Sequence, residues 1–77
     1  MKRYLTRDKI AKLTGRKREW VRQFVKGLKE SGRYPPDEVI EDGHLILIEQ
    51  GVVLDWLRNR NKLKNGETVA PYKEEEA

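Results

Sequence analysis

The chain has 77 residues, a net charge of +4 and 39% charged side chains, and it contains no cysteine. A chain of this length forms one small domain with a compact core. The lack of cysteine excludes disulfide bonds and thiolate metal sites. No apolar run approaches the roughly 20 residues of a membrane span, and none follows the first residues as in a signal peptide. We therefore expect a soluble, intracellular protein.

Positive charge is concentrated in the first half of the chain. Residues 1–33 contain 12 Lys/Arg and three acids, a net charge of +9. Residues 34–61 contain two arginines and six acids, a net charge of −4, and residues 62–77 contain three lysines and four glutamates, a net charge of −1. This asymmetry predicts a polyanionic partner for one face of the molecule. The alternative is a solvated surface that only maintains solubility.

A first helix is predicted to begin after Thr6 and to end at Gly15. Thr6 is a good N-cap, Asp8 complements the helix dipole, and Leu5 can pack on Ile10 as a hydrophobic staple. The helix has barely two turns and would not be stable alone, so it must pack on a neighbour.

The neighbour is a second predicted helix at about residues 17–29. Its apolar stripe consists of Val21, Phe24, Val25 and Leu28, with Trp20 at the margin. A separate stripe is cationic and consists of Arg18, Arg22, Lys26 and Lys29. Two short helices joined by a tight glycine-containing turn describe a helix-turn-helix.

A hairpin and a third helix follow. Asp42-Gly43 lies between two β-rich runs and predicts a two-residue turn. The third helix is expected from residue 49 or 50 to residue 62 or 63, with these residues on its inner side: Val53, Trp56, Leu57, Arg60 and Leu63. The predicted fold is mainly α with a small β-hairpin, a winged helix-turn-helix of order α-α-β-β-α. It occupies residues 1–64, and residues 65–77 are expected to form a disordered polar tail.

The second helix opens with three cations, Arg16, Lys17 and Arg18. A cation at a helix N-terminus costs about 0.3–1 kcal/mol because the dipole is positive there. The placement becomes favourable if a phosphate or a guanine edge binds at this end, because the N–H groups and the side chains then act on one anion. The pattern therefore favours DNA binding over simple solvation.

The candidate DNA-binding residues have different expected roles. Arg18 and Arg22 are candidates for reading guanine, and Gln23 for reading adenine. The other positions are expected to contact phosphates, to reach deeper into the groove, or to touch the backbone from the wing: Arg16, Lys17, Lys26 and His44. His44 is the only histidine, so it is not expected to hold a metal ion.

No catalytic constellation is visible, because the carboxylates lie in a turn, a loop and a tail, and the hydroxyl residues lie at caps. We expect no enzymatic activity, no cofactor and no metal. Trp20 and Trp56 are expected in the core or at its edge, although Trp20 could instead be exposed for a partner.

The stretches "YLTRDKIAKLTGRKREWVRQF" and "VIEDGHLILIEQGVVLDWLRNR" resemble the small winged helix-turn-helix proteins grouped with phage excisionases, MerR-type DNA-binding domains and some phage small terminase subunits. The resemblance covers about residues 4–63. It implies double-stranded DNA binding through the second helix, in an excisionase-like or transcription-regulating phage or prophage protein of the bacterial cytoplasm. A module of this size would act as a monomer or as a weak, DNA-dependent oligomer.

Two positions depart from the family pattern. Lys17 stands where relatives often have a Ser or Thr cap, and the hairpin tip reads Glu41-Asp42-Gly43-His44, which is acidic. An acidic tip facing phosphates is unfavourable. The alternative function is therefore a protein-interaction module that uses the acidic wing and third helix against a terminase, a recombinase or a host protein.

Overall fold

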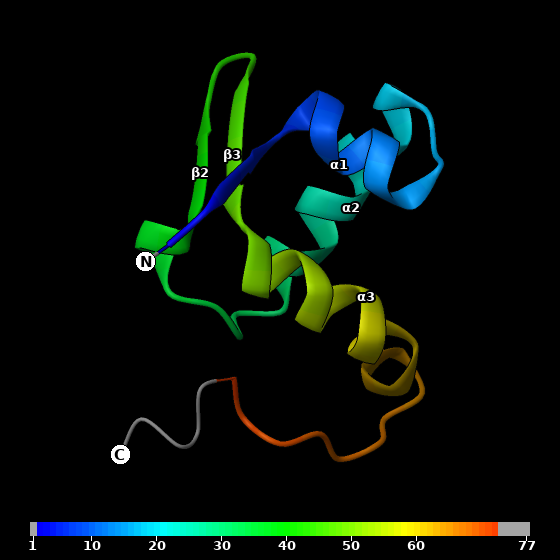
Figure 1. The fold of residues 1–77 in the computed structure, drawn as a ribbon. Helices are drawn as coiled ribbons and strands as arrows, with labels where there is room; N and C mark the ends of the chain where they lie inside the picture. The colour runs from blue at the N-terminus through cyan, green and yellow to red at the C-terminus, as the bar shows by residue number, and fades with distance from the viewer. Residues whose placement is uncertain (1, 73–77) are drawn as a thin grey trace.

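The polypeptide forms three helices and a three-stranded sheet in a computed structural model that describes residues 2–72 (Figure 1). Its elements, in chain order, are β1 (Tyr4–Thr6), α1 (Arg7–Thr14), α2 (Arg18–Glu30), the 3-10 turn η1 (Pro36–Glu38), β2 (Val39–Asp42), β3 (Leu45–Glu49) and α3 (Gln50–Lys64). The predicted mainly α fold with a hairpin is confirmed. The strand β1, which precedes α1, was not predicted.

The ends of α1 are formed by the residues that the sequence indicated. The Thr6 hydroxyl accepts a hydrogen bond from the Lys9 N–H at 3.3 Å. Gly15 adopts a left-handed conformation with φ 69°, and its N–H reaches the carbonyl groups at the end of the helix. This geometry, which favours glycine, reverses the chain so that α2 packs against α1.

The sheet has the order β1-β3-β2, and both strand pairs are antiparallel. The hairpin turn is Gly43-His44, one residue later than predicted, because Asp42 still pairs with Leu45 in the ladder. Both common two-residue hairpin turns require a positive φ at their first position. Gly43, with φ 61°, takes that position and leaves Asp42 in the strand.

The core lies between α2, the inner face of the sheet and α3. The predicted apolar stripe of α2 is buried, as are Val53 and Trp56 of α3. Leu57 and Leu63 are partly buried against the core, while Val52, which was not predicted, is fully buried. Gly27 permits the close approach of α2 and α3.

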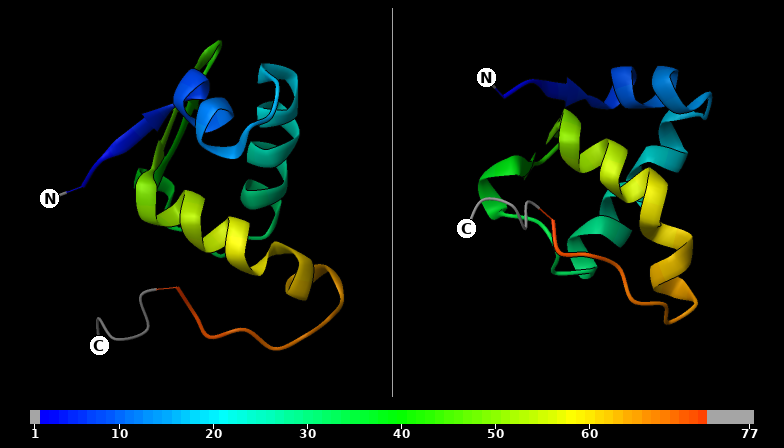
Figure 2. Two further views of the ribbon diagram at one scale, coloured as in Figure 1. Left: turned by 45° about the vertical axis from the view of Figure 1, so that its right-hand side comes forward. Right: turned by 60° about the horizontal axis from the view of Figure 1, so that its bottom comes forward.

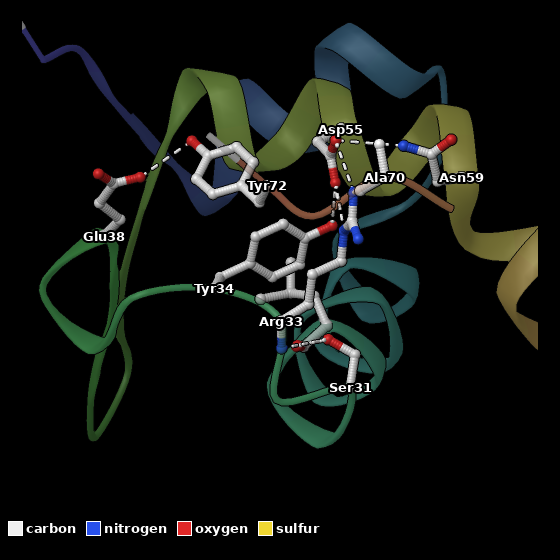
Figure 3. Close-up of polar contacts among 9 residues, drawn as sticks. Ser31, Arg33, Tyr34, Glu38, Asp55, Asn59, Ala70 and Tyr72 are labelled. Carbon is white, nitrogen blue, oxygen red and sulfur yellow. Dashed lines mark hydrogen bonds and ion pairs between the residues drawn. The ribbon is translucent and has the colours of Figure 1, made fainter. Parts of the chain in front are cut away.

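A polar cluster joins the loop after α2, the helix α3 and the chain that follows α3 (Figure 3). Arg33 donates two hydrogen bonds to the Asp55 carboxylate, at 2.8 and 3.3 Å, and the Tyr34 hydroxyl donates a third at 2.7 Å. Arg33 also donates to the Ala70 carbonyl at 2.7 Å. The Tyr72 hydroxyl donates to the Glu38 carboxylate at 3.0 Å. We call this set of residues the internal polar cluster.

The internal polar cluster changes the description of the predicted tail. Residues 65–72 turn back along α3 (Figure 2), and Ala70 and Tyr72 bond to the body of the domain, so a disordered tail does not describe them. The remainder of the prediction, residues 73–77, lies outside the described residues. Composition could not reveal these contacts because they depend on single side chains rather than on a repeating apolar pattern.

Candidate nucleic-acid interface

The exposed side of α2 carries three of the predicted DNA-binding residues. Arg22, Gln23 and Lys26 are exposed, and within residues 2–72 no carboxylate contacts either cation. The helix forces this arrangement because its opposite side is buried in the core. Together with Lys29 and Glu30 of α2 and Glu41 of β2, these three residues line an open groove between α2 and the hairpin.

The N-terminus of α2 has no side-chain cap. Lys17 occupies the N-cap position, with φ −79° and ψ 159°, but its side chain makes no capping hydrogen bond. A helix start of this kind leaves backbone N–H groups without a side-chain acceptor. Arg16 and Lys17 are both exposed beside it. This end of α2 therefore offers N–H groups and cationic side chains to an approaching anion.

Arg18, unlike Arg22 and Lys26, forms an ion pair within the molecule. Its Nε lies 2.8 Å from an Asp8 carboxylate oxygen of α1, and its own carbonyl accepts a hydrogen bond from Arg7. The side chains of Arg18 and Asp8 are 64% and 74% exposed. Exposed ion pairs contribute only about 0–1 kcal/mol. Arg18 can therefore exchange Asp8 for another anion at small cost, and its role in base reading stays a prediction.

The two acids near the hairpin tip, Glu41 and Asp42, leave little free negative charge on the side of the hairpin that faces α2. The Glu41 carboxylate accepts a hydrogen bond from the Lys29 ammonium group at 2.7 Å, which fastens the hairpin to α2. Residues that pair directly across an antiparallel ladder share a face. Glu41 pairs with the buried Ile46 and lies on the inner face, whereas Asp42 pairs with Leu45 on the outer face. His44 is exposed at the tip of the hairpin.

Most carboxylates of the acidic segment have partners inside the molecule. Asp37 and Glu38 pair with Lys2, and Asp55 pairs with Arg33. The Glu49 side chain caps α3 by accepting a hydrogen bond from the N–H of Gly51 at 2.8 Å. With Glu41 bonded to Lys29, five of the six acids in residues 34–61 are engaged, and Asp42 alone has no side-chain partner among residues 2–72.

Unlike these acids, most cations around α2 have no partner of opposite charge among the described residues. Within the part of the chain that the structure describes, six of them have no ion pair: Arg16, Lys17, Arg22, Lys26, Arg60 and Lys64. The acids of residues 34–61 are therefore largely engaged inside the molecule, whereas these six cations around α2 are not paired with a carboxylate of residues 2–72.

Sequence reasoning did not predict one contact of this surface. Arg60 lies on the inner side of α3, as predicted, and its guanidinium group lies over the Trp20 ring of α2, 5.3 Å from the ring centroid. The Arg16 guanidinium group lies over the same ring at 5.2 Å. Trp20 is half-buried beside Phe24, at the edge of the core as predicted. The only signal in the sequence was the spacing of Arg60 and Lys64, four residues apart on one helix.

Within residues 2–72, no group of three or more His, Asp or Glu side chains is placed to hold a metal ion. In the same residues, no helix combines the length and the apolar character needed to cross a membrane. Comparisons with protein-family models, with curated proteins and with solved structures returned no match to this chain.

Proposed function

We propose that the protein binds double-stranded DNA by laying the exposed side of α2 in the major groove. The observation that carries this proposal is the exposed cations of α2, Arg22 and Lys26, which have no carboxylate partner within residues 2–72, while most acids of residues 34–61 are engaged inside the molecule. Unneutralised positive charge on one helix face is what a phosphate backbone requires.

The side chains of α2 would have different roles in binding, some contacting bases and others contacting phosphates. The major groove is about 12 Å wide and admits one α-helix. Arg22 and Gln23 project from the middle of α2, where bidentate bonds to guanine or adenine are feasible. Arg16 and Lys17 flank the uncapped N-terminus and would hold a phosphate together with the backbone N–H groups. Lys26 would contact the sugar-phosphate backbone of the DNA strand that lies on the hairpin side of α2.

The biological role follows from the resemblance to excisionases and related regulators. The protein would bend phage or prophage DNA, or recruit a recombinase or a polymerase to it. One module of this size offers an interface of roughly 600–1,000 Å². High affinity would then require adjacent copies on the DNA or a protein partner, since linked binding events raise the effective concentration.

A titration of labelled duplex by fluorescence anisotropy tests the proposal with matched variants. Arg22→Glu with Lys26→Glu reverses two charges, four residues apart, on the exposed side of α2. Arg58→Glu with Lys62→Glu makes the same change on α3, beside the internal polar cluster. We expect the first variant to lose at least 100-fold in affinity and the second to stay within about threefold of wild type. Equal behaviour of the two variants would contradict the proposal.

A second candidate function is docking of a protein partner on the outer face of the hairpin. Ile40 is 37% exposed and Leu45 is 50% exposed there, beside Asp42, which makes no ion pair within residues 2–72. This face points away from α2, so the two functions are compatible. Survival of the biological activity in the Arg22→Glu, Lys26→Glu variant would favour the protein-docking function.

A further inference from the structure

Two guanidinium groups gather on one indole ring without a counter-ion. Arg16 precedes α2 and Arg60 belongs to α3, yet both lie within 5.3 Å of the Trp20 ring centroid. Neither group contacts a carboxylate within residues 2–72. Two like charges that contact the same ring repel each other, and the ring compensates for only part of this repulsion. The arrangement becomes favourable when an anion binds between or beside the two groups.

Arg60 lines a hollow between α2 and α3, and Arg16 adjoins it through the shared Trp20 ring. Besides aromatic and glycine residues, its lining includes Gln23 from α2 and Arg60 and Lys64 from α3. Gln23 also lines the groove on the hairpin side of α2, where Arg22 and Lys26 lie. The exposed ridge of α2 at Gln23 is therefore flanked by cations on both sides.

We infer that Arg60, Lys64 and Arg16 form a second phosphate-binding edge, which contacts the DNA strand opposite the one held on the hairpin side. This inference rests on the proposed function. A helix is about 10–12 Å across with its side chains, so it fills a major groove about 12 Å wide. The groove has a sugar-phosphate backbone on each wall, and the cations on the α3 side of α2 face the second wall.

Trp20 acts as a positioning residue for this edge. Its ring is held on one side by the core, where Phe24 lies at a centroid distance of 5.1 Å. Contact with the ring restricts both arginine side chains before any ligand arrives, which lowers the entropy lost when they bind. Arg16 and Arg60 thereby couple the start of α2 to the end of α3 in one preformed surface.

The third helix supplies its own matched control. Arg58 and Lys62 have the same residue types and spacing as Arg60 and Lys64, but they line a different hollow, with Arg33 and the segment that follows α3. Neither pair forms an ion pair within residues 2–72. Neutralising each pair changes the net charge equally, so any difference in DNA binding reports position rather than charge.

The experiment compares duplex binding of wild type with three variants at several salt concentrations. The variants are Arg60→Gln with Lys64→Gln, Arg58→Gln with Lys62→Gln, and Arg22→Gln with Lys26→Gln. Each lost phosphate contact makes the negative slope of log K against log salt less steep by about 0.9. We expect a change of about 1.8 for the first variant, which loses two phosphate contacts, and of about 0.9 for the third, which loses the Lys26 contact and the base contact of Arg22. The affinity should fall about tenfold in both, and the second variant should behave as wild type.

Two further readouts separate phosphate binding from a structural role. The Arg58→Gln, Lys62→Gln and Arg22→Gln, Lys26→Gln variants should unfold at the wild-type urea concentration, since their altered side chains make no ion pairs within residues 2–72. The Arg60→Gln, Lys64→Gln variant should lose no more than the contact of Arg60 with the Trp20 ring, which lowers the urea midpoint only slightly. Trp20→Leu retains an apolar side chain but removes the ring beneath Arg16 and Arg60. It should weaken duplex binding about threefold, and combining it with Arg60→Gln should add little to that loss.

Different results overturn different claims. A wild-type slope and affinity for the Arg60→Gln, Lys64→Gln variant, with a clear loss for the Arg22→Gln, Lys26→Gln variant, would overturn this inference alone. An equal loss in the Arg58→Gln, Lys62→Gln variant would overturn it too, because total charge would then explain the effect. Failure of the wild-type protein to bind duplex would overturn the proposed function and the second edge together.

Discussion

Arginine serves two different purposes in two regions of this small domain. In the internal polar cluster, the side chains of Arg33 and Asp55 are only 11% and 18% exposed, and Tyr34 and Asn59 complete the hydrogen bonding of the carboxylate. On the surface around α2, Arg22 is exposed and contacts no carboxylate within residues 2–72. The same residue type is a structural tie in one region and an available charge in the other.

The comparison separates stability from function. A partly buried, fully hydrogen-bonded ion pair leaves an uncompensated charge when one partner is removed, so its disruption is expensive. An exposed cation without a partner contributes little to folding, and its removal relieves repulsion from its neighbours. Substitutions in the internal polar cluster should therefore change stability, whereas those around α2 should change binding.

The largest expected effect on stability is that of Arg33→Ala. This change leaves the Asp55 carboxylate without its ion-pair partner and removes the hydrogen bond to the Ala70 carbonyl. We expect the free energy of unfolding to fall by about 3 kcal/mol, measured by urea titration. Arg22→Ala is the control and should stay within about 0.5 kcal/mol of wild type. Similar losses in both variants would remove the distinction between the two regions.

The pH dependence of stability should also report the internal polar cluster. Burial, together with a hydrogen bond to a carboxylate, raises the pKa of Tyr34 and of Tyr72 above the usual value. A raised pKa in the folded state stabilises the protein below the unfolded value of about 10, and this contribution is lost as the pH rises further. We expect the urea midpoint to fall above about pH 10. Tyr34→Phe should make that fall shallower, and an unchanged profile in this variant would refute the assignment.

In the acid range, the internal polar cluster should make stability fall as the pH decreases, the opposite direction to the alkaline range. Burial disfavours the charged form of Asp55, but hydrogen bonds from Arg33 and Tyr34 outweigh this effect and hold its pKa below the usual range. Its contribution to stability is therefore present above about pH 3.9 and is lost as the pH falls through the lower folded value. In Asp55→Asn, the loss of stability on acidification should be smaller than in wild type, as measured by urea titration at each pH.

A smaller effect is expected at the uncapped start of α2. Serine at an N-cap accepts a backbone N–H bond that Lys17 does not accept. Lys17→Ser should stabilise the protein by about 1 kcal/mol and, by removing one phosphate contact, weaken duplex binding several-fold. A change of stability and affinity in the same direction would show that Lys17 is not retained for binding.

The smallest effect is expected from Asp42→Lys. Asp42 lies on the outer face of the hairpin and makes no ion pair with the described residues. Folding and duplex affinity should stay close to wild type, which urea and anisotropy titrations would check. A large loss of biological activity without these changes would direct attention to a protein partner of the outer face.

Much of the fold could be predicted from local signals. Thr6 and Gly15 bracket α1 because capping chemistry is encoded in single residues, and the buried stripe of α2 follows from helical periodicity. The strand β1 was missed because three residues show no usable alternation, and its pairing with β3 depends on contacts distant in sequence.

The candidate site was predictable only in part. The charge pattern placed Arg18, Arg22, Lys26 and Lys29 on one side of α2, and all four are exposed, but it did not show which charges are neutralised. The pairing of Arg18 with Asp8 and of Lys29 with Glu41 depends on tertiary packing. The approach of Arg60 to Trp20 joins two helices and has no counterpart in the local sequence.

The most direct test of DNA binding is a titration of wild-type protein with duplex at several salt concentrations. Counter-ions released by about five phosphate contacts should give a slope of log K against log salt near −4.5. Such a slope would show that the exposed cations meet a phosphate backbone. A flat salt dependence, or no binding at micromolar protein, would contradict the proposed function.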